Sequence, residues 1–156
     1  MDSYLLVIGY GNTLRRDDGV GPKVAAALER LRLQGVLTIA CPQLTPELAD
    51  PLSRAGAAVF VDASVEHRGP VRLRQLGPAD SSQILAHAAD PRVLLALARD
   101  AFGRAPRSWM LTIPAKELGF GERLSRPAAL GLRDAVRLVR GLRLRLRGRR
   151  RAETSA

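Results

Sequence analysis

The hydrophobic pattern of the chain alternates between short apolar runs and longer segments with helical spacing. Compact runs of four to six mainly apolar residues, bounded by glycine, proline or polar residues, predict buried strands. We place these strands at residues 5–8, 36–40, 57–61, 71–76 and 109–113. In the fourth run, arginines alternate with apolar residues, as in a strand with one exposed face, so we expect this strand near an edge of the sheet.

Helical spacing fills most of the segments between these runs. Apolar residues recur every three or four positions after Val20, after Asp90-Pro91 and after Ser125, and a shorter helix interrupted by Pro51 is expected after Thr45-Pro46. Strands that alternate with helices predict an α/β fold. We therefore expect a three-layer α/β/α sandwich with a mainly parallel, roughly five-stranded sheet.

The charge of the chain is concentrated near its end. The 156 residues carry a net charge of +10, but eight arginines and no acid lie between Arg137 and Arg151, and residues 1–136 hold 17 basic and 14 acidic residues. We assign residues 1–142 to a single domain and residues 143–156 to a basic tail that we expect to be frayed. The tail lacks interleaved aromatic residues, so nucleic acid is not the partner we expect.

Composition also bears on the compartment. The opening residues carry an acid where the basic start of a secretory signal belongs, and no apolar stretch approaches the roughly 18 residues that span a bilayer. The single cysteine, Cys41, allows no internal disulfide and suits a reducing compartment. We expect a cytoplasmic protein without a membrane partner, in which Cys41 is a small buried thiol.

The stretch from Gly9 to Gly21 joins the first strand to the first helix. It contains four glycines, Asn12, and the adjacent acids Asp17 and Asp18. Glycines allow tight turns and close approach of another chain. Two acids at the start of a helix can cap it, bind a metal, or do both.

This glycine-rich stretch does not fit a dinucleotide site. Gly9 and Gly11 supply the first two glycines of the G-x-G-x-x-G pattern, but Leu14 stands in the third position. The acid expected after the second strand is also missing, because Cys41 or Pro42 stands there. We therefore expect no organic cofactor.

Three side chains are predicted to meet at the carboxyl ends of the strands, where ligands bind in open α/β sheets. Asp18 follows the first strand, Asp62 ends the third, and His87 precedes the helix that begins near Asp90. A carboxylate that ends a buried strand has to be paired or coordinated to offset its desolvation. Two carboxylates and one imidazole suit a divalent transition metal with an open position. The alternatives are a helix cap for Asp18 and an ordinary loop histidine for His87; His67 is a weaker candidate.

The pattern Gly9-x-Gly11-Asn12-x-Leu14-x-x-Asp17-Asp18-Gly19-x-Gly21 resembles the signature of the nickel–iron hydrogenase maturation endopeptidases. These enzymes remove a C-terminal extension from the hydrogenase large subunit after nickel has been inserted. The resemblance extends over residues 59–63, the histidine before the later helix, and residues 119–125. After the second strand, residues 41–48 keep Thr45 but lack the glycines common in the family, which leaves open which hydrogenase is served.

The resemblance implies a role for each candidate residue. Asp18, Asp62 and His87 are expected to contact nickel carried by the precursor of the large subunit, with Asp18 and Asp62 catalytic. Gly11, Asn12, Asp17 and Thr45 are expected to contact the substrate, the glycines clearing space for its C-terminal segment. Asp17 would also cap or support the loop.

Two rival functions remain open at this point. A peptidyl-tRNA hydrolase-like esterase also opens with a strand and a G-x-G-N loop, but it needs a histidine soon after that loop, where this chain has Asp17-Asp18-Gly19. A non-catalytic partner would hold the large subunit without cutting it, and the sequence does not distinguish binding from cutting.

Overall fold

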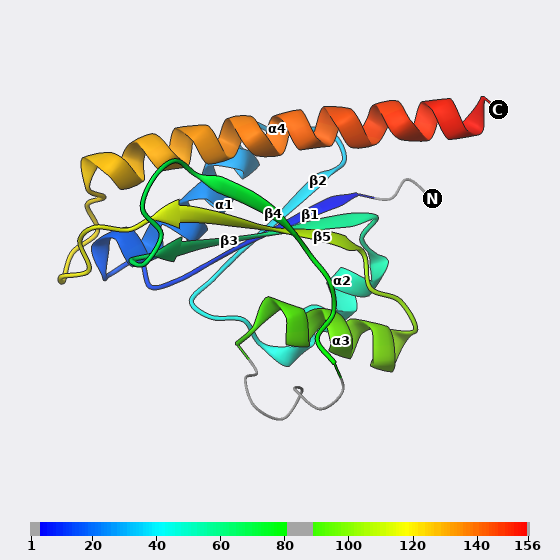
Figure 1. The fold of residues 1–156 in the computed structure, drawn as a ribbon, viewed down its shortest axis with the longest axis horizontal. Coiled ribbons are helices and arrows are strands. Elements are labelled where there is room, and N and C mark those ends of the chain that lie inside the picture. The colour runs from blue at the N-terminus through cyan, green and yellow to red at the C-terminus, as the bar shows by residue number, and fades with distance from the viewer. Residues whose placement is uncertain (1–3, 81–88, 156) are drawn as a thin grey trace.

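The structure is a computed structural model that describes residues 4–80 and 89–155 (Figure 1). Five strands form one sheet, with bounds β1 Leu5–Tyr10, β2 Val36–Cys41, β3 Ala57–Ser64, β4 Arg72–Leu76 and β5 Arg107–Pro114. The helices are α1 Val20–Arg30, α2 Ala49–Arg54, α3 Pro91–Phe102 and α4 Arg126–Thr154, with short 3-10 helices η1 Arg16–Gly19 and η2 Pro46–Leu48.

The sheet has the order β2-β1-β3-β5-β4. The pairs β1–β2, β1–β3 and β3–β5 are parallel, and β4 pairs with β5 in the antiparallel sense. The arginine-alternating strand β4 therefore lies at an edge, as predicted. The mainly parallel, five-stranded α/β fold is confirmed.

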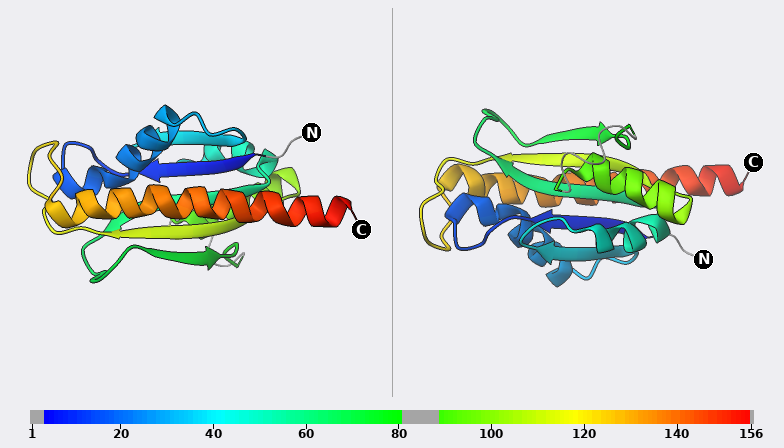
Figure 2. Two further views of the ribbon diagram at one scale, coloured as in Figure 1. Left: turned by 90° about the horizontal axis from the view of Figure 1, so that it is seen from above. Right: turned by 90° about the horizontal axis from the view of Figure 1, so that it is seen from below.

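Helices cover both faces of this sheet (Figures 1 and 2). On one face α1 and α4 pack against alternate residues of the central strands, such as Val7, Val59 and Leu111. On the other face α2 and α3 pack against the intervening residues, such as Ile8 and Phe60. Because side chains alternate across a strand, these apolar runs supply both cores at once.

The helix ends follow local sequence signals. Asp90 caps α3 by accepting from the backbone N–H of Arg92 at 2.8 Å, and Gly103 ends that helix in the left-handed region. Ser125 caps α4 by accepting from the N–H of Ala128. The proline-interrupted segment after Thr45 forms two short pieces, η2 and α2, in place of one regular helix.

The segment that we assigned to a basic tail is helical in the structure. Helix α4 continues without interruption through the basic segment to Thr154, well past the boundary that we set at residue 142 (Figure 1). Arginine is a good helix former, so the charge change does not stop the helix. The Arg143 guanidinium also donates to the carbonyl of Gln34 from both Nε and Nη2, at 3.1 and 2.8 Å, which joins the segment to the turn before β2.

Across residues 4–80 and 89–155, every helix falls short of the length and apolar character needed to cross a bilayer.

Candidate functional site

Two carboxylates lie at the carboxyl ends of neighbouring parallel strands. Asp62 belongs to β3, and Asp18 lies in η1, the turn that follows β1. Since β2 and β3 flank β1 on opposite sides, the chain leaves β1 at the point where the strand order reverses. Ligands bind at such points in open α/β sheets. The structure thus brings both predicted acids to one edge of the sheet.

Asp62 is a partly buried carboxylate with a raised pKa. Burial raises its pKa from 3.8 to about 6, and the negative charge of Asp18 adds to the rise. Two hydrogen bonds act in the opposite direction: the backbone N–H of Ala63 donates to Oδ1 at 2.8 Å, and the Tyr10 hydroxyl donates to the same carboxylate. Asp18 and Asp62 therefore repel each other across the site, and a cation that contacts both would relieve that repulsion.

Tyr10 is a site residue that the sequence did not reveal. It lies at the end of β1, one position beyond the Gly9–Val61 pair of the β1–β3 register, and so lies beside Asp62 on the face covered by α2 and α3. Burial, and then the charge of Asp62, raise the pKa of Tyr10, so its hydroxyl stays protonated and acts as a donor. The sequence signal that could have found Tyr10 is the alternation of side chains in β1 and β3. It places Tyr10 and Asp62 on the same face of the sheet as the buried residues two positions before each of them.

The glycine-rich loop holds Asp18 by backbone contacts. The N–H of Asn12 donates to Asp18 Oδ2 at 2.9 Å, and the side-chain oxygen of Asn12 accepts from the N–H of Leu14 at 2.9 Å. Gly11 has a φ of +141°, and a Cβ at that position would lie 1.9 Å from the carbonyl oxygen of Asp18. Gly11 and Asn12 therefore shape the turn that presents Asp18.

The other glycines of this stretch make room for the chain's own backbone. A Cβ on Gly9 would lie 2.0 Å from the carbonyl oxygen of Gly21, and a Cβ on Gly21 would lie 2.5 Å from that of Val61. The start of α1 thus packs directly on β1 and β3. The space beside Gly9 and Gly21 is filled by the chain's own backbone, and room for another protein's C-terminal segment along this loop stays a prediction.

Of the roles predicted for Asp17, the contacts in the structure correspond to support of a loop. Its side chain is fully buried, and Oδ2 accepts from the N–H groups of Lys116 and Glu117 at 2.8 and 2.9 Å. The N–H and hydroxyl of Ser125 donate to Oδ1 and Oδ2 at 2.7 and 2.6 Å. Burial alone would raise the pKa of Asp17, but the Ser125 hydroxyl and these backbone donors hold it below its ordinary value.

Asp17 therefore fixes the loop between β5 and α4 beneath η1. Neither Asp17 nor Asp18 caps a helix, since no side-chain cap is formed at the start of η1 or of α1. The expected contact between the Asp17 side chain and a substrate is also corrected, because that carboxylate has no exposed surface. Of the two adjacent acids, only Asp18 reaches the site.

The remaining predicted residues occupy the same edge or fall outside the described chain. Thr45 precedes η2 in the loop after β2, is partly buried, and makes no side-chain cap hydrogen bond. His87 lies outside the described residues. Within the described ranges, no group of three or more His, Cys, Asp or Glu side chains could hold a metal ion. A metal ion in contact with the carboxylates of Asp18 and Asp62 would therefore need further ligands from outside the described residues.

Comparison with known proteins gives matches at the level of structure. No protein-family model and no curated protein sequence matches the chain. The solved structure of the hydrogenase maturating endopeptidase HybD from E. coli is 18% identical with a TM-score of 0.68, covering 87% of this chain and 89% of its own. The NiFe hydrogenase maturation protease HybD from Thermococcus kodakarensis is 24% identical with a TM-score of 0.68, covering 89% and 98%.

A third solved structure similar to this chain is also named as a hydrogenase maturation protease. The NiFe hydrogenase maturation protease HycI from Thermococcus kodakarensis KOD1 is 19% identical with a TM-score of 0.69, covering 88% of this chain and 90% of its own. These similarities confirm that the chain has the fold of the hydrogenase maturation proteases over most of its length.

Proposed function

We propose that this chain is an endopeptidase that removes the C-terminal extension from a nickel-loaded precursor of a nickel–iron hydrogenase large subunit. The observation that carries the proposal is the pair Asp18 and Asp62, held at the switch point of a sheet whose solved neighbours are named maturation proteases. The motif from Gly9 to Gly21, which resembles the signature of the same enzymes, supports it independently.

The metal in this proposal belongs to the substrate. A precursor that holds nickel through its own ligands would present an incompletely ligated ion, and Asp18, Asp62 and His87 would complete the set. Carboxylates ligate metals in their ionised form, and a cation favours that form. A precursor without nickel would leave the two carboxylates repelling each other, so the site would favour the loaded precursor.

Two chemical routes to cleavage are compatible with this arrangement. The substrate's metal can polarise the scissile carbonyl or lower the pKa of an attacking water. Alternatively, one carboxylate accepts a proton from that water as a general base. In both routes Tyr10 holds Asp62 in place through its hydroxyl, and the turn at Gly11 and Asn12 holds Asp18.

The experiment is a trimming assay with an alanine variant of Asp62. Asp62→Ala is expected to reduce cleavage of a nickel-loaded precursor by at least about 100-fold, the effect of losing a metal ligand or a general base. The matched control is Asp134→Ala, which removes an exposed carboxylate from α4. Circular dichroism of both variants checks the fold. Undiminished cleavage by Asp62→Ala would rule out the assigned site.

A further inference from the structure

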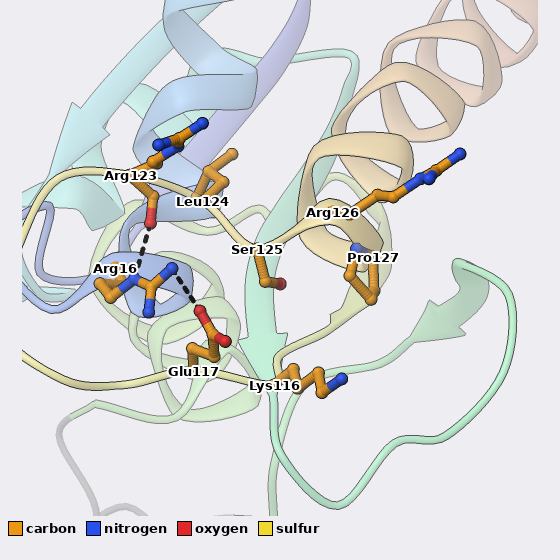
Figure 3. Close-up of a pocket in the computed structure, with 8 residues that line it drawn as sticks. All are labelled: Arg16, Lys116, Glu117, Arg123, Leu124, Ser125, Arg126 and Pro127. Carbon is orange, nitrogen blue, oxygen red and sulfur yellow. Dashed lines mark hydrogen bonds and ion pairs between the residues drawn. The ribbon is translucent and has the colours of Figure 1, made fainter.

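A cationic groove runs along the α4 side of the same sheet edge. Two cavities, of about 440 and 470 Å³, form it and share Lys116 and Pro127 in their walls. The first cavity lies between η1, the loop that follows β5 and the start of α4 (Figure 3). The second reaches the loop that follows β3, where Val65, His67 and Arg68 line it.

The walls of this groove carry a marked excess of positive charge. The lining residues include five permanent cations and one carboxylate: Arg16, Arg68, Lys116, Arg123 and Arg126 against Glu117. The carboxylate is already paired, because Glu117 forms an ion pair with Arg16. Figure 3 shows Arg16 directed toward Glu117, while Lys116 and Arg126 extend away from that pair. Several cations therefore remain to attract an anionic ligand.

Residues that are close together in the chain connect the groove to the carboxylate site. Arg16 lines the groove, Asp18 lies at the site, and the buried Asp17 between them binds the backbone of Lys116, Glu117 and Ser125, which all line the groove. On the other side, the loop residues that line the second cavity directly follow β3, the strand that carries Asp62. Residues two positions from Asp18 and three positions from Asp62 therefore line the groove, although the two acids themselves do not.

We propose that this groove binds an extended peptide segment that bears carboxylates. Under the proposed function, on which this identification rests, the segment is the part of the precursor beyond the scissile bond. Basic side chains in the lining suit acidic side chains or a terminal carboxylate. The lining also includes Leu124, Pro114 and Pro127, which offer apolar contacts. Among the described residues that line the two cavities there is no Phe, Tyr or Trp, the large aromatic side chains on which single-strand nucleic-acid sites stack bases.

The test measures binding of synthetic peptides by fluorescence anisotropy. One labelled peptide alternates glutamate with alanine and ends in a free carboxylate; a second has an amidated end; a third replaces every glutamate by glutamine. The double variant Arg68→Glu with Lys116→Glu reverses two exposed charges of the groove. The control Arg133→Glu with Arg140→Glu makes the same change in net charge on exposed positions of α4 that line neither cavity.

We expect the glutamate peptide to bind the wild-type protein and the α4 variant alike, and to bind the groove variant at least about tenfold more weakly. Binding should weaken as salt is added. Comparison with the glutamine peptide measures how much the acidic side chains contribute to binding. Comparison with the amidated peptide measures the contribution of the terminal carboxylate. In trimming, the groove variant should raise KM and leave kcat unchanged.

Two results would overturn the proposal. If the groove variant and the α4 variant weaken peptide binding equally, net charge alone attracts the peptide. If no carboxylate peptide binds the wild-type protein, the groove does not bind the proposed ligand. Peptide binding is measured without a hydrogenase precursor. Peptide binding without any trimming would therefore contradict the proposed protease function while supporting the groove.

Discussion

Replacing Asp62 by asparagine is expected to make the protein more stable at neutral pH although it removes a residue of the proposed site. In the folded protein burial raises the pKa of Asp62 from 3.8 to about 6, with a further contribution from Asp18. In the unfolded chain the pKa returns to its ordinary value. Between these two values the folded state binds more protons than the unfolded state, so the stability contributed by Asp62 is lost as pH rises from about 4 to about 6.

The size of this loss follows from the two pKa values. One unit of pKa is worth about 1.4 kcal/mol, so the rise from 3.8 to about 6 corresponds to about 3 kcal/mol at neutral pH. Asp62 keeps some solvent exposure, and screening lowers the expected gain of the asparagine variant to about 1–3 kcal/mol. Asparagine has nearly the same shape, and its amide oxygen can still accept from the Tyr10 hydroxyl.

Urea unfolding followed by circular dichroism provides the measurement. Wild type and Asp62→Asn are compared at about pH 4 and about pH 7.5, near the lower pKa and above the upper one. The difference in free energy of unfolding should be small in acid and favour the variant at neutral pH. Asp134→Asn, which removes an exposed carboxylate, should show no such change. A variant that is less stable than wild type at neutral pH would refute the reasoning.

Two further substitutions test how the site is held. Asp17→Asn is expected to lower the free energy of unfolding by about 1–3 kcal/mol at neutral pH, because the new NH₂ group must face a donor. Burial opposes ionisation of Asp17, but hydrogen bonds from Ser125, Glu117 and Lys116 lower its pKa. Its contribution is therefore lost as pH falls below about 4, and urea midpoints of variant and wild type that differ as much at about pH 2 as at about pH 7 would contradict this. Gly9→Ala is expected to cost at least about 2 kcal/mol or to prevent folding, because its Cβ would meet the Gly21 carbonyl at 2.0 Å. Gly77→Ala, where a Cβ meets nothing within 4 Å, is the control, and equal thermal midpoints for the two alanine variants would count against the packing argument.

The sequence was sufficient for the sheet and for the position of the acids. A buried strand such as β3 is a continuous apolar run, and its end places Asp62 at the carboxyl edge whatever the rest of the chain does. Local signals likewise placed the starts of two helices after Asp90 and after Ser125, because a helix start depends only on residues two or three positions away.

The sequence was not sufficient where a role depends on distant partners. Asp17 binds groups about 100 residues further along the chain, and no local pattern connects it to Ser125. Tyr10 becomes a partner of Asp62 only through the register of β1 with β3. The helical structure of the basic segment was not predicted, because charge was read as a sign of fraying, although arginine favours helix and Arg143 is bonded to Gln34.

The most direct test of the central claim is the intact mass of a hydrogenase large-subunit precursor after incubation with this protein. Nickel-loaded and nickel-free precursor are compared in parallel, each with and without the protein. The proposed function predicts loss of the C-terminal extension only when both nickel and the protein are present. Equal cleavage of both precursor forms would contradict recognition through the substrate's metal, and a stable complex without any mass loss would contradict the protease itself.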